Sequence, residues 1–333
     1  IQAEAILELK LRHLAKLEEV KIQAEQAELA TEKDKLELLL SSENRLKTFI
    51  KKELQAIVKE FGDERRCKII ANVSSAQAFN EDDLMPAENM TIVLSSKGWV
   101  RSAKGHEIDP TTLNYKSGDE YLLSVKGRSN KNAIFIDSTG RSYTLPANAL
   151  PSARGQGEPL TGKLSPPAGA QFVDVLMGED TQKILLSSDA GYGFVATIKD
   201  LLSSRQAGKH TLSLPMESKV MRVVLVNDME SEFVSVATNR GRLLVFPISE
   251  LPILAKGKGN KLIQIPSKNI KAREEFVLGI CVLSPAQSLK VYAGKRHLSI
   301  KFSDLENYIS HRAKRGNLLP KGYQNISKIQ AVD

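Results

Sequence analysis

Lysine and arginine recur at regular intervals in the second part of the chain, each time within a short glycine-rich segment. These segments are residues 152–157, 205–209, 256–261 and 312–316. Glycine lets a phosphate group approach the backbone N–H groups, and lysine and arginine neutralise its charge. The pattern therefore indicates binding of a polyanion such as a nucleic acid backbone. The alternative is that these lysines only keep surface loops in solution.

The basic segments belong to a repeat that is anchored on glycine. Five glycines between short β-branched runs mark its copies, at spacings of 42, 51, 50 and 53 residues: Gly98, Gly140, Gly191, Gly241 and Gly294. A glycine in this setting is typical of a β-hairpin turn. An apolar residue follows ten or eleven positions after each one: Ile108, Leu150, Leu201, Leu251 and Leu305. A period of about 40–50 residues built from short strands predicts a β-propeller, here with five blades and four strands per blade.

Further strands are expected outside the hairpins. Two more strands are expected in each full unit, for example residues 211–214 together with 222–226, and residues 261–265 together with 276–283. The first repeat is shorter, so we expect it to lack a strand or to share one with a neighbour. Each blade then presents a basic loop at an equivalent place.

The candidate DNA-binding residues are the basic side chains that flank the five glycines or lie in the loops after them. They are Arg101, Lys104, Lys116, Arg128, Lys131, Arg141, Arg154, Arg205, Lys209, Arg242, Lys256, Lys258, Lys261, Arg312, Lys314 and Arg315. Trp99, next to the first glycine, is interpreted as a packing residue, with stacking on a base as the alternative.

Catalytic and metal-binding motifs are not visible in the sequence. None of the five histidines has a second His or Cys at metal-ligand spacing, so no zinc site is predicted. We find no Walker A loop, Gly-x-Ser-x-Gly or Gly-x-Gly-x-x-Gly motif. Cys67 and Cys281 are expected to be free thiols in a reducing cytoplasm.

The amino-terminal part of the chain has a different composition. Residues 1–61 contain no Gly or Pro and are rich in Ala, Glu, Lys and Leu, which predicts helices over about 2–14, 16–40 and 43–61. The last of these carries an apolar stripe that needs a partner helix. The sequence begins within the helical pattern at Ile1, so an excised fragment is expected. Residues 62–86 are interpreted as a linker, and residues 87–333 as the propeller.

Charge is divided unevenly between the two parts. From residue 86 onward Lys and Arg exceed Asp and Glu by 11, whereas residues 1–85 have a net charge of −3. The propeller is therefore the cationic part, which suits a polyanion that follows its rim. The hydrophobic content of 41% is compatible with a sizeable core and argues against intrinsic disorder. No apolar run approaches the length of a membrane span.

Helices, a linker and a basic propeller, in this order, resemble the carboxy-terminal portion of the A subunit of bacterial type IIA DNA topoisomerases. Residues 2–14 resemble the family's C-terminal dimer gate, and residues 61–66 (Phe-Gly-Asp-Glu-Arg-Arg) resemble the end of its coiled coil. Gly98-Trp99-Val100-Arg101, residues 153–157 and residues 188–193 resemble its blade motifs. The resemblance covers essentially the whole chain.

Gyrase and topoisomerase IV are the two family members that compete. Gyrase carries a strongly basic, glycine-rich box on its first blade, where this chain has Leu-Asn-Tyr-Lys-Ser-Gly-Asp-Glu at 113–120. That segment keeps one Lys and adds Asp119 and Glu120. This departure, with five repeats instead of six, favours the A subunit of topoisomerase IV. The gyrase A domain, which wraps DNA for negative supercoiling, is the alternative.

The resemblance implies ATP-dependent passage of one DNA duplex through a double-strand break in another, for decatenation and relaxation during chromosome segregation. The propeller would bind and bend the transported duplex without sequence preference. The family's tyrosine nucleophile follows an Arg, and none of the seven tyrosines here does, so the cleavage centre is expected outside this chain. ATP and Mg²⁺ would be used by other domains and by the B subunit, with no cofactor in this chain.

The partners implied are double-stranded DNA, the B subunit of topoisomerase IV, and a second copy of the A subunit through the dimer gate, in an A2B2 heterotetramer. The location implied is the cytoplasm, at the nucleoid, and the family also allows peripheral association with the inner membrane. Two rival functions remain at this point. A protein-interaction scaffold predicts little duplex affinity, and an enzymatic propeller would need convergent acids or a metal site in its channel, for which no candidate is visible.

Overall fold

The structure is a computed structural model that describes residues 1–63 and 87–332, with no description of the side chains of residues 9–14 and 17. The chain divides into two units, residues 1–77 and 78–333, which we describe separately. The predicted linker lies outside the described residues from position 64 onward, and so do Cys67 and the end of the 61–66 motif.

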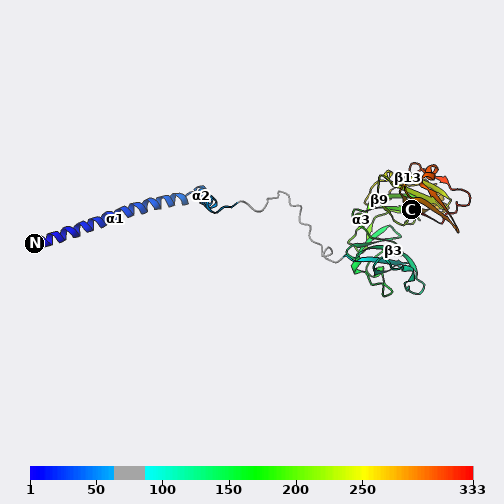
Figure 1. Cartoon of the computed structure of the whole chain (residues 1–333), viewed down its shortest axis with the longest axis horizontal. Helices are drawn as coiled ribbons and strands as arrows, with labels where there is room; N and C mark the ends of the chain where they lie inside the picture. Colours follow the sequence, from blue (N-terminus) through cyan, green and yellow to red (C-terminus); the bar gives the residue numbers. More distant parts are fainter. Residues whose placement is uncertain (64–86, 333) are drawn as a thin grey trace. The chain divides into compact units, whose positions relative to one another are not determined.

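Two helices form the amino-terminal unit (Figure 1): α1 (Gln2–Leu40) and α2 (Glu43–Phe61). The prediction of separate helices over 2–14 and 16–40 is wrong, because α1 continues through Ala15 and Lys16, two strong helix formers. The break at Ser41–Ser42 is confirmed. No residue of α2 is buried, and its apolar stripe, including Phe49, Ile50 and Phe61, is exposed.

The second unit consists of five antiparallel sheets that follow one another along the chain, from the cyan to the red part of Figure 1. We call them blades 1 to 5. Blade 1 contains β3 (Tyr121–Arg128), β1 (Asn89–Ser95), β2 (Trp99–Lys104) and β6 (Glu158–Pro159) in spatial order. Blade 2 contains β10 (Lys209–His210), β5 (Arg141–Pro146), β4 (Asn132–Asp137) and β7 (Phe172–Leu176).

Blades 3 and 4 have the same plan, whereas blade 5 has three strands, so the prediction of four strands per blade is wrong for blade 5. Blade 3 contains β11 (Val224–Val226), β8 (Lys183–Ser188), β9 (Tyr192–Thr197) and β14 (Asn260–Lys261). Blade 4 contains β15 (Val277–Leu283), β12 (Phe233–Thr238), β13 (Arg242–Pro247) and β18 (Asn317–Leu318). Blade 5 contains β17 (Arg296–Lys301), β16 (Ser288–Ala293) and β19 (Lys328–Val332).

Short helical turns connect the strands. They are η2 (Pro110–Thr112), η3 (Ala147–Ala149), η4 (Leu160–Gly162), α3 (Ile198–Leu201), η5 (Ile248–Glu250), α4 (Ser267–Lys271) and η6 (Phe302–Tyr308). Four of these turns follow the second strand of a hairpin and bring the apolar residue of the repeat into the core. Leu150, Leu201, Leu251 and Leu305 are buried as a result, whereas Ile108 of the first repeat is only half-buried.

The five predicted hairpins are confirmed. Each repeat glycine occupies the turn between the first two strands of its blade and has a positive φ, between 59° at Gly294 and 82° at Gly140. A residue with a Cβ adopts this conformation only at a cost, which explains the choice of glycine. Of the two alternatives for repeat one, a missing strand or a shared one, the shared strand is observed, and sharing extends to blades 2, 3 and 4.

In blades 1 to 4 the fourth strand comes from the repeat that follows the blade's own hairpin. It lies in a four-residue segment that begins with glycine, which we call a latch: residues 157–160, 208–211, 259–262 and 316–319. The two middle residues of each latch pair with the second hairpin strand. The fourth residue donates its backbone N–H to the carbonyl of the repeat glycine, at N···O distances of 3.0, 3.1, 2.7 and 2.8 Å in blades 1 to 4. The basic segments predicted as free loops therefore lead into structural strands.

Each latch requires a glycine for two reasons: its backbone has a positive φ, and there is no space for a Cβ atom. Gly157, Gly208, Gly259 and Gly316 all have positive φ values, and a Cβ at each would lie within 2.3–2.7 Å of a neighbouring atom. At Gly259 that neighbour is the carbonyl oxygen of Gly193, at 2.3 Å. The predicted strands 211–214 and 261–265 are wrong, because the strands here cover only 209–210 and 260–261, followed near the first by a single bridge between Leu212 and Gly257. The strands expected together with them form over 224–226 and 277–283.

The core lies between successive blades and not in one centre. Four buried clusters join blades 1 and 2, 2 and 3, 3 and 4, and 4 and 5. The first pairs Ile92 and Leu94 of blade 1 with Phe135 and Tyr143 of blade 2. Among the described residues no buried cluster joins blades 1 and 5, so the series of sheets is open. Each interior blade is therefore stabilised by two neighbours and each terminal blade by one.

The latch glycines give a stability test. We expect Gly259→Ala to lower the free energy of unfolding by about 3 kcal/mol or more, because the new methyl group meets the Gly193 carbonyl in addition to the cost of a positive φ. Gly294→Ala is the matched control, since Gly294 has a φ of 59° and no atom within 4 Å of a Cβ. It should cost only about 1–2 kcal/mol. Urea unfolding of both variants measures the difference, and equal losses would contradict the structural role of the latch.

Candidate nucleic-acid interface

Part of the predicted basic set holds the latches in place. Arg141 Nη1 donates to the carbonyl of Ala207 at 3.0 Å, and Arg242 Nη1 donates to that of Gly316 at 3.0 Å. Both arginines directly follow a repeat glycine. The equivalent residue of blade 3 is Tyr192, whose ring lies 3.8 Å from the Lys258 ammonium. The position after the repeat glycine therefore contacts the incoming latch segment in these three blades.

Arg101 is a buried residue and not a surface contact. Its side chain is 3% exposed, and Nη1 donates to the carbonyls of Asn114 at 2.8 Å and Gly155 at 3.3 Å. The guanidinium also lies 4.3 Å from the centre of the Tyr115 ring. Nη2 is buried without a hydrogen-bond partner among the described residues. We infer that Arg101 joins the 113–120 segment to the loop before the first latch.

In the fourth basic segment, acidic residues contact Arg315 through its side chain and Arg312 through its backbone. Arg315 Nη2 contacts Glu275 Oε2 at 2.5 Å, and Glu250 accepts from the backbone N–H of Arg312 at 2.9 Å. Burial would raise the pKa of Glu275, but hydrogen bonds from Arg315 and Asn269 keep that pKa below its ordinary value. The carboxylate therefore stays ionised at neutral pH. Of this segment's predicted residues, Lys314 and the side chain of Arg312 have no carboxylate within 4.0 Å among the described residues.

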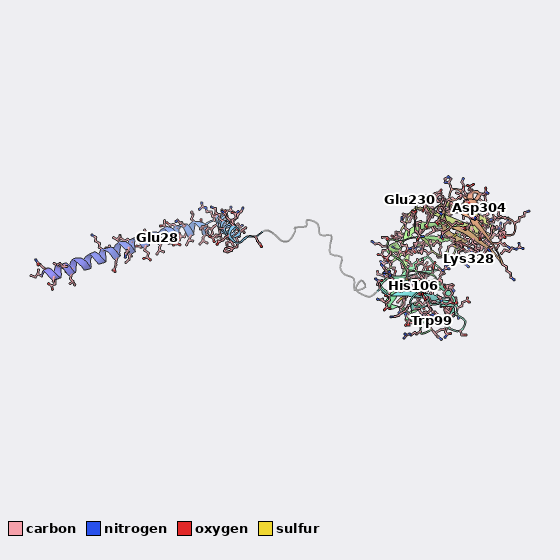
Figure 2. All side chains as sticks on the ribbon, in the orientation of Figure 1. Glu28, Trp99, His106, Glu230, Asp304 and Lys328 are labelled. Atoms are coloured by element: carbon pink, nitrogen blue, oxygen red, sulfur yellow. The ribbon has the colours of Figure 1, made fainter. Side chains whose placement is uncertain are left out.

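The first blade has an aromatic residue covered by a cation. The Lys116 ammonium lies 3.5 Å from the centre of the Trp99 ring, and Trp99 is half-buried opposite Pro159 of the first latch. Figure 2 marks Trp99 on this blade. Trp99 belongs to none of the buried clusters, so packing and stacking on a base both stay predictions for this ring. Nearby, burial would raise the pKa of Asp119, but hydrogen bonds from Ser95, Ser96 and the backbone N–H groups of Lys97 and Glu120 lower it overall. A negative charge thus stands beside Lys116.

Exposed ion pairs involve two more of the predicted residues. Lys104 Nζ lies 2.7 Å from Glu88, and Lys131 Nζ lies 2.6 Å from Glu179. Pairs of this kind contribute little to stability, so a phosphate could replace the carboxylate at small cost. The remaining predicted residues have no carboxylate within 4.0 Å among the described part of the chain. They are Arg128, Arg154, Arg205, Lys209, Lys256, Lys258 and Lys261.

Other exposed cations were missed by the sequence reasoning. Lys126, Lys199, Lys268, Lys271 and Lys301 are exposed and lie on strands or short helices outside the glycine-rich segments. These lysines share no sequence motif. The only sequence feature that could have predicted them is the net positive charge of this part of the chain. The structure thus spreads the free positive charge over more of the surface than the four predicted segments.

Two hollows lie beside equivalent basic segments. The larger one, of about 540 Å³, is lined by Arg141, residues 202–205, residues 208–210 and Lys256. The smaller one, of about 420 Å³, is lined by Ala103, Lys104, Ile108 and residues 152–154. The first has five side chains that can carry positive charge, whereas the second has two. No acidic residue lines either hollow.

The described residues contain few groups that could bind a metal ion or act as a nucleophile. No cluster of His, Cys, Asp and Glu there has the geometry of a metal site. Burial raises the pKa of Cys281 to about 12, so this thiol is unreactive at neutral pH. No helix in the described ranges combines the length and the hydrophobicity needed to cross a lipid bilayer.

Comparisons with known proteins agree with this architecture. The family described as the DNA gyrase C-terminal domain, a β-propeller, matches residues 182–227 and 232–280. A solved structure of the E. coli ParC C-terminal domain is 47% identical, with a TM-score of 0.68, and the match covers 74% of this chain and 99% of that one. The A subunit of DNA topoisomerase 4 from Pseudomonas aeruginosa is 50% identical over 99% of this chain, and that from Escherichia coli K12 is 49% identical over 99%. The chain belongs to the family of topoisomerase IV A subunits.

The chain spans less than half of the length of these family members, 44% of the Pseudomonas protein and 43% of the E. coli protein. A gyrase A C-terminal domain structure is 14% identical, with a TM-score of 0.55 over 74% of this chain, and so shares the fold. The predictions of family membership and of a gyrase-A-type propeller are confirmed, and the identities favour the topoisomerase IV branch over gyrase. The predicted DNA-contacting residues stay a prediction.

Substitutions of Arg101 and Arg205 test which of the two arginines stabilises the fold and which one contacts DNA. We expect Arg101→Met to lower the free energy of unfolding by about 2–3 kcal/mol, because the two charge-assisted hydrogen bonds from the buried guanidinium to the carbonyls of Asn114 and Gly155 are lost. The folded variant should keep its affinity for a DNA duplex within about twofold, since a buried charge makes no phosphate contact. Arg205→Met, on an exposed residue, should change stability by less than about 0.5 kcal/mol and weaken duplex binding instead. If Arg101→Met instead kept its stability and lost duplex affinity, Arg101 would be a DNA-contacting residue.

Proposed function

We propose that residues 87–333 bind duplex DNA without sequence preference, as the DNA-binding part of the A subunit of a topoisomerase IV. The main support is the set of unpaired cations on and beside successive latches, at equivalent places in successive blades. A duplex that follows this series meets positive charge from each repeat, which neutralises phosphates and releases counterions. Nothing in the described residues has the form of a recognition helix for base edges.

The proposal includes the role of the domain in a larger enzyme. The domain would bend the transported duplex and favour particular DNA crossings, while the whole enzyme decatenates and relaxes DNA with ATP. The cleavage tyrosine and the ATPase would lie outside this chain, the latter on the B subunit, with Mg²⁺ bound there and in other domains. The helices α1 and α2 would contribute to the A-subunit dimer of an A2B2 enzyme at the bacterial nucleoid.

A salt series with the full 333-residue chain tests duplex binding. We expect similar affinities for duplexes of different sequence, and a logarithm of the binding constant that falls linearly with the logarithm of the salt concentration. The slope should be about −0.9 for each phosphate contacted. Fluorescence anisotropy with two unrelated duplexes measures both properties. Binding that ignores salt, or that prefers one sequence strongly, would contradict the proposal and favour a protein-interaction scaffold.

A second experiment tests whether the domain bends or wraps DNA. Asp119, which its hydrogen bonds keep ionised, places a negative charge beside Lys116 on blade 1, and like charge repels phosphate. We therefore expect bending without a full wrap. Nicked circles ligated with the chain bound should show little change in linking number. A large change per bound molecule would restore the gyrase alternative.

A further inference from the structure

The larger of the two hollows is built by three successive repeats. Arg141 comes from the hairpin of blade 2, residues 202–205 follow α3 of the next repeat, and residues 208–210 form the latch of blade 2. Lys256 comes from the segment before the following latch, and its neighbour Gly257 bridges to Leu212. The hollow therefore exists only when the latches are seated. Contacts between successive repeats position the hollow, and no single sequence motif does so.

The charge of this hollow is unbalanced. Its lining contains Arg141, Arg205, Lys209, His210 and Lys256, together with the hydroxyl groups of two serines at 203 and 204, and no Asp or Glu. None of the five basic side chains has a carboxylate within 4.0 Å among the described residues. Closely spaced cations repel one another, so an anion in the hollow would be stabilised by all of them.

Two of the equivalent places in other repeats lack this property. In the repeat before, residues 152–154 line a hollow with two cations, and one of these, Lys104, is paired with Glu88. In the last basic segment, Arg315 is paired with Glu275, and Glu250 accepts from His311 and from the backbone of Arg312. The hollow beside blade 2 therefore holds more unpaired cations than either of these two places.

Two of the cations are held in fixed positions. Arg141 Nη1 donates to the Ala207 carbonyl at 3.0 Å, and Lys209 Nζ donates to the Asp200 carbonyl at 2.6 Å. Both side chains are half-buried, whereas Arg205, His210 and Lys256 are exposed. A Cβ on Gly208 would lie 2.6 Å from the Tyr143 ring, so the backbone here has little room to move. Cations that are already ordered lose less conformational entropy when they bind an anion.

The nearby carboxylates are committed elsewhere. Asp137 is fully buried and accepts from Tyr143 Oη, from Thr139 and from the backbone N–H of Arg141. The Thr197 hydroxyl donates to Asp200 and lowers the pKa of that carboxyl, which caps α3. Neither carboxylate lines the hollow. Asp200 still interacts electrostatically with Lys209, so the five basic side chains of the hollow outweigh this nearby acid without being independent of it.

We propose that this hollow is the principal phosphate-binding seat of the domain. Guanidinium, ammonium and hydroxyl donors from several directions suit a tetrahedral phosphate, and the volume, which is within the range of small-molecule pockets, leaves room for the attached sugar. The inference rests on the proposed function in one respect, that the phosphate belongs to a DNA backbone. A free phosphate compound would offer the same chemistry, and the two sources are separated experimentally.

Duplex binding by two matched double variants of the full chain is the first test. Arg205→Ser with Lys256→Ser removes two exposed cations from the seat. Lys268→Ser with Lys271→Ser removes the same charge from exposed positions on α4. We expect the seat variant to lose about tenfold or more in duplex affinity and the control less than about threefold, because only the seat contacts are charge-assisted hydrogen bonds in a shaped site.

Inorganic pyrophosphate titrated into the full chain is the second test, read by proton NMR of the histidine rings. The His210 signals, assigned with His210→Gln, should shift, while those of His106 and His297 should stay in place. The shift should disappear in the seat variant and persist in the control. Urea unfolding of both variants confirms that each is folded.

The outcomes separate the two proposals. Duplex binding that both variants weaken equally, with no shift of His210, would overturn the seat and leave the proposed function intact. A His210 shift in a chain that binds no duplex would retain the seat for a free phosphate compound and overturn the proposed function. Selective loss in the seat variant together with the shift supports both.

Discussion

The hydrogen bond between each latch and a repeat glycine is the interaction on which the propeller depends. It joins the carbonyl of Gly98, Gly140, Gly191 or Gly241 to a backbone N–H some 60–80 residues further along the chain. The bond forms only where the latch glycine adopts a positive φ and brings its backbone against the neighbouring strand. Because each latch belongs to the next repeat, the same bond closes one blade and links it to its successor.

This linkage decides how the basic residues are used. Arginine, with a planar fork of donors, ties a hairpin to a carbonyl that lies in a latch or shortly before one, at Arg101, Arg141 and Arg242. Lysines such as Lys256 and Lys314 have no ion-pair partner in the described part of the chain and keep their charge in water. The sequence feature that indicates a nucleic acid surface is thus also the feature that holds the fold together. A loss of binding in an arginine variant therefore needs a stability measurement beside it.

The open series of blades has consequences for its two ends. Stability in such a fold is approximately a sum over blades and their shared interfaces, so the terminal blades have less support. Blade 5 has no latch on β17 in the described residues, and this edge strand carries Arg296, His297 and Lys301. Charged residues on an exposed edge discourage pairing with another chain. On the same blade, Lys290 and Lys328 cover the ring of Tyr292. Its outer side has the polar character expected of a terminal repeat.

The sequence by itself determined the five hairpins, the helical amino-terminal unit and the cationic character of the propeller. These features follow from local chemistry, because a glycine turn such as Gly191, flanked by β-branched runs, specifies a hairpin without help from distant residues. Only the tertiary structure decided which hairpin each two-residue latch strand joins, that Arg101 is buried, and that the cations beside blade 2 gather in one hollow. The physical reason is that each depends on a contact between residues far apart in the chain, and a strand of two residues has no periodicity from which its partner could be predicted.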